Sequence, residues 1–173
     1  MKQGSRIIAL CGPESTGKST LSNYLASAFD AYLIDEIARR YVEKLPLPYT
    51  YSDVEQIAQL QIAALDEALR SEPKLIVMDT WLIITKVWFQ VVYGNYPNWL
   101  EEAIRRVPID HYLLCAPDIP WVYDPVRENP DNREELFQRY LAEIQHYGFS
   151  FTVIEGDFEN RQRTASTLVS SLI

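Results

Sequence analysis

The chain has 173 residues, 47% apolar and 23% charged, with a formal net charge of −8. These values predict one soluble globular domain over 1–173, and the acidic balance argues against a broad basic face for nucleic acid. The most apolar stretch, 81–93, is too short for a membrane span, so we expect no membrane partner. The polar start gives no sign of a signal peptide, and the two cysteines fit reduced core residues, so we expect a cytoplasmic location.

An apolar run over 7–11 predicts a buried strand, and the segment after it matches the phosphate-binding pattern G-x-x-x-x-G-K-[ST]. A helical pattern over 21–29 follows, which completes the strand, loop and helix that this motif needs. The glycines let backbone N–H groups point at phosphate oxygens, and the helix N-terminus adds further donors. Lys18 is expected to reach the β- and γ-phosphates and stabilise their charge, and the Ser19 hydroxyl to bind Mg²⁺. The predicted ATP-binding residues of this loop are Gly12, Pro13, Glu14, Ser15, Thr16, Gly17, Lys18, Ser19 and Thr20.

A second apolar run, 31–34, ends in the acidic pair Asp35 and Glu36, and a helical segment over 37–44 follows. A carboxylate at this strand end would lie across the crevice from the γ-phosphate, where it could accept the proton of an attacking hydroxyl. One of the two acids is therefore the candidate catalytic base, and the alternative is a solvated pair that stabilises the helix N-terminus. Arg39 shares a helical face with Glu36 and could orient that carboxylate or bind substrate.

Helices alternate with short apolar strands along the rest of the chain. A capping box at Ser52–Glu55 predicts the start of a helix that ends near residue 71. Because each strand is a continuous apolar run, the sheet is expected to be parallel and covered by helices on both faces. We therefore predict an α/β fold with a five-stranded parallel sheet. Strands are expected at 7–11, 31–34, 75–79, 111–115 and 151–154, and the later helices at 82–93, 98–106, 133–147 and 159–172.

Parallel sheets of this kind bind ligands beyond the carboxyl ends of their strands. Asp79 ends the strand at 75–79, and its carboxylate is expected to hold Mg²⁺ as in the Walker B pattern; the alternative is a helix cap. Six aromatic residues are expected near the crevice or its flanking helices: Tyr41, Tyr49, Tyr51, Trp81, Trp88 and Trp121. Some could stack on a planar base, with Trp81 and Trp121 as the substrate-binding candidates, but core packing is the expected role of any one of them.

The segment over 117–133 is long for a loop in a compact domain, so we predict that it acts as a lid. Closure would exclude water that competes with the acceptor for the phosphoryl group. Arg127 and Arg133 could neutralise charge during the transfer. The alternative is an ordered surface loop in which these arginines pair with Asp124 and Asp131.

Four segments of the sequence resemble the ribosylnicotinamide kinase domain of the bacterial NadR family, itself related to nucleoside and nucleotide kinases. They are CGPESTGKST at 11–20, DEIARRY at 35–41, DTWL at 79–82 and PDIPWVYDPVR at 117–127, the last with Asn132–Arg133 just after it. The resemblance implies a P-loop NTPase fold with a lid. It also implies transfer of the γ-phosphate of ATP, with Mg²⁺, to the 5′-hydroxyl of nicotinamide riboside, which gives nicotinamide mononucleotide.

The resemblance further implies roles for single residues. Glu36 and Arg39 would contact the acceptor, and Asp79 would serve the metal. The closing lid would contain Asp124 as a substrate-binding residue together with Arg127 and Arg133. The loop after the last strand would lie near adenine, which adds the candidate ATP-binding residues Gly156 and Asp157.

Two other functions stay open at this stage: a kinase for another nucleoside or for a nucleotide, and a P-loop ATPase that acts as a regulatory switch. The sequence has no N-K-x-D guanine motif, and the lid arginines favour transfer over switching. A monophosphate acceptor would call for several arginines, whereas the acidic pair suits an uncharged or cationic nucleoside. The sequence also lacks the H-x-G-H adenylyltransferase motif of full-length NadR proteins, so we expect another protein to complete NAD. The oligomeric state is not indicated.

Overall fold

The computed structural model describes residues 4–46, 48–122 and 131–173. Its centre is a five-stranded parallel sheet with the order β2-β3-β1-β4-β5, which confirms the predicted α/β class. Every strand agrees with its predicted range to within one residue at each end. The strands are β1 (Arg6–Cys11), β2 (Tyr32–Ile34), β3 (Leu75–Asp79), β4 (His111–Cys115) and β5 (Phe151–Ile154).

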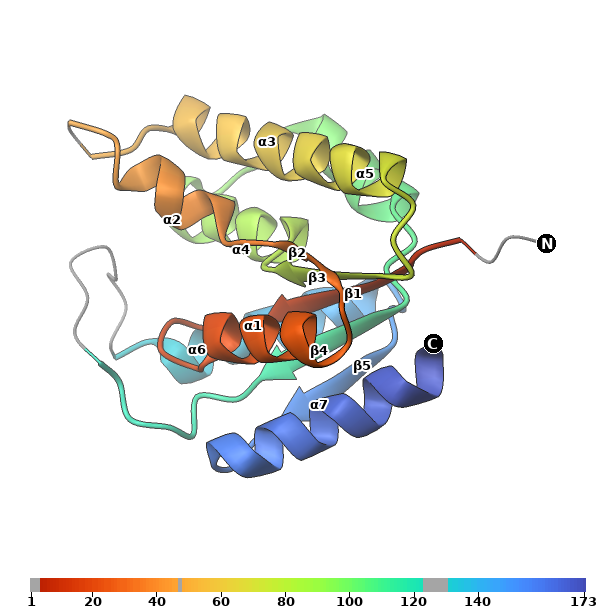
Figure 1. Cartoon of the computed structure of the whole chain (residues 1–173). Coiled ribbons are helices and arrows are strands. Elements are labelled where there is room, and N and C mark those ends of the chain that lie inside the picture. Colours follow the sequence, from red (N-terminus) through yellow and green to blue (C-terminus); the bar gives the residue numbers. More distant parts are fainter. Residues whose placement is uncertain (1–3, 47, 123–130) are drawn as a thin grey trace.

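Helices cover both faces of the sheet (Figure 1). One face packs against α1 and α7, and the other lies under the group formed by α3, α4, α5 and α6. Along the described chain the helices are α1 (Lys18–Ala28), α2 (Ile37–Val42), α3 (Tyr51–Arg70), α4 (Leu82–Tyr93), α5 (Asn98–Arg106), α6 (Arg133–His146) and α7 (Phe158–Leu172).

The side chains of β1 alternate between two hydrophobic cores. Ile8 and Leu10 belong to the core under α1 and α7, whereas Ile7 and Ala9 belong to the core on the opposite face. Successive side chains of a strand point to opposite faces of the sheet. Both faces of β1 are therefore buried, which is why its sequence is a continuous apolar run.

The start of α3 differs from its predicted cap. Thr50 is the N-cap, and its hydroxyl accepts a bond from the Asp53 backbone N–H at 3.4 Å while the Asp53 carboxylate accepts the Thr50 N–H at 2.8 Å. The capping box is therefore Thr50–Asp53 and not Ser52–Glu55. Ser52 already lies inside the first turn, where its hydroxyl cannot serve as the N-cap.

The carboxyl ends of the strands meet at one edge of the sheet, where the loop after β1 passes close to the end of β4. A Cβ atom at Gly12 would lie 2.6 Å from the Cys115 carbonyl oxygen, and Gly12 has a φ of 143°. Only glycine satisfies both constraints. This close approach fixes the start of the loop over 12–17 against β4.

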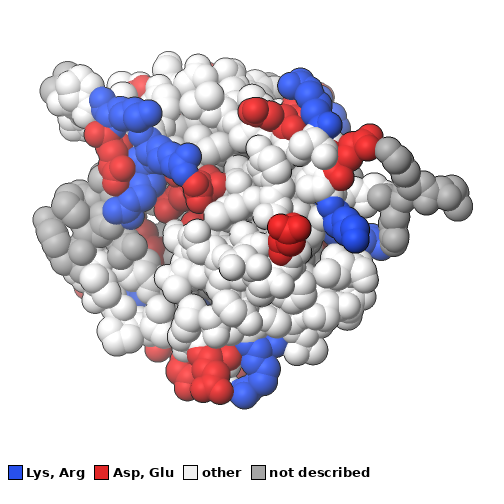
Figure 2. Space-filling view, viewed as in Figure 1, with Lys and Arg blue, Asp and Glu red and all other residues white. Residues whose placement is uncertain are grey.

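The surface in Figure 2 carries Lys and Arg interspersed with Asp and Glu, with uncharged surface between the groups. Among the described residues, no helix combines the length and the apolar character that crossing a membrane requires.

Candidate active site

A cavity of about 430 Å³ lies at the carboxyl edge of the sheet and has two contrasting sides. The P-loop wall consists of Gly12 and residues 14–20. The helical wall consists of Ala38, Arg39 and Val42 from α2, Pro48 and Tyr49 from the following loop, and Ile84, Trp88, Val91 and Val92 from α4. Glu36 and Thr80 also line the cavity.

The P-loop wall is shaped by hydrogen bonds within the loop. The Pro13 carbonyl oxygen accepts from the Thr16 hydroxyl at 2.8 Å and from the Lys18 ammonium at 2.7 Å. Ser15 and Gly17 have positive φ values of 52° and 76°. Helix α1 begins directly after Gly17 with no side-chain cap bond, so its first N–H groups stay available to an anion. The loop therefore presents donors of the kind that phosphate oxygens accept.

The described part of the predicted lid is attached to the P-loop. The Ser15 hydroxyl and the Val122 backbone are joined by contacts of 3.2 and 3.3 Å. Nη1 of Arg133 donates to the Ser15 carbonyl at 3.3 Å and to the Ile119 carbonyl at 2.9 Å. Arg133 thus lies against the backbone of the P-loop, where its charge can act on a bound phosphate. Two predicted lid residues, Asp124 and Arg127, lie outside the described residues.

Asp79 ends β3 beside β1, because it pairs with Leu10 in the sheet register, and Thr80 follows it directly. Asp79 is 3% exposed, and its Oδ1 atom has no hydrogen-bond partner within the described residues. The buried Thr80 hydroxyl likewise has none there, and Thr80 has a φ of 77°, a strained value for a β-branched residue. Unsatisfied polar atoms and backbone strain of this kind are common at ligand sites.

The donor set fits a magnesium ion. An unpaired buried carboxylate oxygen on Asp79 and the Ser19 hydroxyl in the cavity wall are oxygen ligands of the kind that Mg²⁺ prefers. Among the described residues no cluster of three His, Cys, Asp or Glu could form a separate metal cage. Mg²⁺ is usually held by one or two carboxylates together with substrate phosphates, so this donor set is compatible with the ion, although Asp79 itself does not line the cavity.

The acidic pair after β2 is divided between cavity and surface. Glu36 lines the cavity at the N-cap of α2, whereas Asp35 forms a surface ion pair with Arg40. Arg39 lines the cavity, and its Nε donates to Glu43 at 3.0 Å. The structure thus brings Glu36 and Arg39, and not Asp35, to the cavity.

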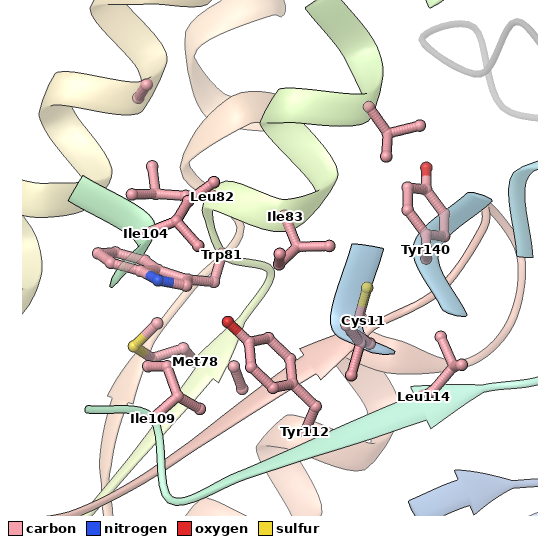
Figure 3. Close-up of a cluster of buried hydrophobic side chains, with 14 of the residues drawn as sticks. Cys11, Met78, Trp81, Leu82, Ile83, Ile104, Ile109, Tyr112, Leu114 and Tyr140 are labelled. Carbon is pink, nitrogen blue, oxygen red and sulfur yellow. The ribbon is translucent and has the colours of Figure 1, made fainter. Parts of the chain in front are cut away.

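Of the three tryptophans expected near the crevice, Trp88 lines the cavity, whereas the substrate-binding candidates Trp81 and Trp121 do not. Trp81 is 2% exposed and packs in the core beside Met78, Leu82 and Ile104 (Figure 3). It does not line the cavity, so we correct its predicted role in substrate binding to core packing. Trp88, two turns along α4, lines the cavity and meets Tyr49 edge to face, with ring centroids 4.7 Å apart. Trp121 is half-buried and also lies outside the cavity lining.

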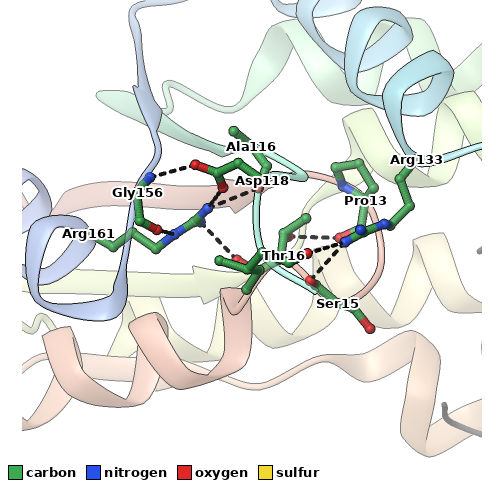
Figure 4. A network of polar contacts seen from close by, with 9 residues as sticks. Pro13, Ser15, Thr16, Ala116, Asp118, Arg133, Gly156 and Arg161 are labelled. Atoms are coloured by element: carbon green, nitrogen blue, oxygen red, sulfur yellow. Dashed lines mark hydrogen bonds and ion pairs between the residues drawn. The ribbon is translucent and has the colours of Figure 1, made fainter. Parts of the chain in front are cut away.

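The predicted adenine-side loop lies at a second, open hollow. Gly156 lines this hollow, and the Asp157 carboxylate caps α7 by accepting the Asn160 N–H at 2.9 Å. Sequence reasoning missed the two residues that hold this loop. Asp118 accepts the Gly156 N–H at 2.6 Å and forms an ion pair with the buried Arg161 (Figure 4). Neither stands in a recognisable pattern, although Asp118 follows a strand end and falls inside a segment of family resemblance.

The parallel sheet and the loop that follows β1 together define a P-loop protein. Residues 7–161 match the family described as AAA domain, and the chain belongs to this family.

Curated relatives agree with the resemblance found in the motifs. The trifunctional NAD biosynthesis/regulator protein NadR of Escherichia coli K12 is 29% identical over 179 residues, which cover 97% of this chain and 43% of NadR. The chain therefore spans less than half the length of this relative. The predicted likeness to the NadR proteins is confirmed.

Solved structures agree on the fold. NadR protein in complex with NR superposes with a TM-score of 0.83 at 18% identity, covering 98% of this chain and 52% of that one. Deoxyadenosine kinase from M. mycoides superposes with a TM-score of 0.68 at 16% identity, covering 95% of this chain and 99% of that one. Both likenesses concern the fold of the chain.

Proposed function

We propose that the protein is an ATP-dependent kinase that transfers the γ-phosphate to the 5′-hydroxyl of a nucleoside, with nicotinamide riboside as the expected acceptor. The observation that carries this proposal is one cavity with a phosphate-binding loop on one side and an aromatic, apolar wall on the other. A triphosphate on the P-loop wall and a planar base on the helical wall would bring two reactants together, which is how such enzymes lower the barrier.

The P-loop wall would bind ATP. Backbone N–H groups of residues 14–19 and the start of α1 would hold the β- and γ-phosphates. Lys18 would exchange its bond with the Pro13 carbonyl for one with phosphate oxygens, and Arg133 would add positive charge from the outer side of the loop. Gly156 and Asp157 would lie on the adenine side.

Asp79 and Ser19 would hold Mg²⁺ together with the phosphates, and the ion would supply charge neutralisation there. Closing of the predicted lid, with Asp124 and Arg127, remains part of this proposal.

Glu36 is the proposed base. It lines the cavity between the P-loop wall and the helical wall, so a hydroxyl held there could pass its proton to the carboxylate. Asp35 is engaged with Arg40 at the surface and is the weaker candidate. Arg39, on the same helix and also in the cavity lining, would bind acceptor oxygens.

The composition of the cavity favours a nucleoside over a nucleoside monophosphate. Among the described residues that line it, the cations are Lys18 and Arg39, and Lys18 belongs to the ATP side. One arginine offers little to an acceptor phosphate, whereas Glu36 would attract a cationic pyridinium ring. The solved NadR complex with NR supports the same acceptor, and deoxyadenosine kinase supports the alternative of another nucleoside.

The test is an acceptor panel. Purified protein with ATP and Mg²⁺ is given nicotinamide riboside, deoxyadenosine, deoxycytidine, thymidine monophosphate or no acceptor, and phosphorylated products are measured by mass spectrometry. We expect nicotinamide riboside to stimulate ATP consumption at least about tenfold. Basal hydrolysis that no acceptor stimulates would contradict the kinase and favour a regulatory ATPase.

The identity of the base is tested by two neighbouring variants. Glu36→Gln is expected to lower kcat by about 10²–10³, the usual contribution of a general base. Asp35→Asn is the matched control, and its turnover should stay within about twofold of wild type. The reverse outcome would assign the base to Asp35.

A cytoplasmic location and the lack of a nucleic-acid partner stay predictions.

A further inference from the structure

Arg161 is a charged side chain buried behind the P-loop, outside the cavity and outside every sequence motif. It is 2% exposed, in the first turn of α7. Burying a guanidinium is unfavourable unless it is paired and hydrogen-bonded, so its position demands a reason. We propose that Arg161, neutralised by Asp118, is a positioning residue that orients the P-loop backbone for the phosphates of ATP. This inference rests on the ATP-dependent function proposed above.

One guanidinium joins three loops that follow three different strands. Nη1 donates to the Thr16 carbonyl at 3.0 Å, Nη2 to the Ala116 carbonyl at 3.1 Å, and Nε to the Gly156 carbonyl at 2.7 Å. Nη2 also meets the carboxylate of Asp118 (Figure 4). The loops after β1, β4 and β5 are therefore held in one arrangement by a single side chain.

The bond to Thr16 has a direct consequence for the P-loop. In a trans peptide the C=O and the N–H point in opposite directions, and the described chain contains no cis peptide bond. Because Arg161 binds the Thr16 carbonyl, the Gly17 N–H is directed away from Arg161. Arg133 acts in the same way on the Ser15 carbonyl and hence on the Thr16 N–H. Because the cations bind these carbonyl oxygens from outside the cavity, the N–H groups of the same peptides are directed the other way. These N–H groups are therefore available to an anion inside the cavity.

Asp118 completes the arrangement. Its second oxygen accepts the Gly156 N–H at 2.6 Å, so the same carboxylate pairs with Arg161 and holds the loop after β5. Gly156 lines the second hollow, next to Asn160 and Thr164. A conformational change in the loop after β5 would therefore be transmitted to Thr16 through the guanidinium of Arg161. Lysine could not replace the arginine, because its single ammonium cannot reach carbonyls on three loops with the fork geometry of guanidinium.

The test measures ATP binding separately from acceptor turnover. Full-length Arg161→Lys and Asp118→Asn are titrated with a non-hydrolysable ATP analogue by calorimetry at a temperature well below their melting points. We expect Kd for the analogue to rise about 10- to 100-fold in Arg161→Lys and less in Asp118→Asn, which retains an oxygen acceptor for Gly156. The KM for the acceptor, at saturating ATP, should change by less than about threefold in both.

Arg163→Lys is the matched control, because Arg163 is exposed two residues further along α7, where its guanidinium donates to Asn160. Its affinity for the analogue should equal that of wild type. An unchanged Kd in folded Arg161→Lys and Asp118→Asn would overturn the positioning role, as would an equal rise in Kd and in acceptor KM. If Arg161→Lys does not fold, Asp118→Asn alone decides between these results. Wild-type protein that fails to bind the analogue would overturn the proposed function itself, which is a distinct result.

Discussion

The two walls of the cavity are built on different physical principles. The P-loop wall presents backbone groups, and two of its carbonyls, those of Ser15 and Thr16, are bound from outside the cavity by Arg133 and Arg161. The helical wall consists of apolar side chains that partly face solvent, and Val91 and Val92 are each 47% exposed. A wall made of fixed backbone suits the invariant part of a substrate, whereas a wall of side chains suits the part that differs between substrates. Under the proposed function, binding of ATP and binding of the acceptor should therefore be separable by mutation.

The largest effect is expected on the P-loop wall. Lys18→Ala removes the ammonium that would stabilise charge on the transferring phosphate, and loss of such a group lowers kcat/KM by about 10²–10³. Steady-state kinetics with ATP as the varied substrate measures this. Lys74→Ala is the control, because Lys74 is an exposed lysine before β3, and its kcat/KM should equal that of wild type. A loss of kcat/KM below tenfold in Lys18→Ala would contradict the proposed role of the P-loop wall in stabilising the phosphate charge.

An intermediate effect is expected on the helical wall. Trp88→Ala removes an indole that meets Tyr49 edge to face, and an aromatic contact worth about 1.4 kcal/mol corresponds to a tenfold rise in acceptor KM. The Kd for ATP should stay within about twofold. Trp99→Ala is the control, since Trp99 on α5 bonds to Glu55 at 2.8 Å and does not line the cavity. A parallel loss of ATP affinity in Trp88→Ala would show that the walls are coupled.

The smallest effect on catalysis concerns the support of the helical wall. Lys86 on α4 is buried and bonds to Glu101 on α5 at 2.7 Å and to Glu143 on α6 at 2.8 Å, which fixes α4 against both helices. Burial opposes the charge of Glu101, but bonds from Lys86, Tyr147 and Tyr96 prevail and lower its pKa from 4.5 to about 2. The stability that Glu101 contributes is therefore complete above pH 4.5 and is lost as the pH falls towards 2.

Glu101→Gln is expected to lower the melting temperature at pH 7 by about 5 °C, because a charged hydrogen bond is lost, and to flatten its decline between about pH 4.5 and 3. Thermal melts across that pH range measure both effects, with the exposed neighbour variant Glu102→Gln as control. Acceptor KM should change by less than about threefold. A pH profile identical to that of wild type would contradict the role of this ion cluster.

How far the sequence predicted these walls follows from what each is made of. The P-loop is contiguous and acts through its backbone, so a motif locates it. Glu36 was expected at the crevice because the ends of parallel strands converge on one edge, and it lines the cavity, whereas the metal role of Asp79 stays a prediction. Helix α4 is apolar nearly all round, so its pattern could not tell that Trp88 faces the cavity, nor that Trp81 just before the helix faces the core. The role of Arg161 was not predicted, because it bonds to backbone carbonyls on three loops, and such bonds produce no pattern in the sequence.

Thr80 joins the two walls, and its position limits how the substrate range of this protein can change. It is the single residue between Asp79 on β3 and Trp81 at the N-cap of α4, and its left-handed φ of 77° costs about 1–3 kcal/mol. Substitutions near the start of α4 act directly on this strained link and so on the carboxylate of Asp79. Val91 and Val92 lie about two turns or more away, at the solvent end of the helix. Under the proposed function, new acceptor preferences would therefore arise by mutation at that end, while the phosphate-binding residues stay unchanged.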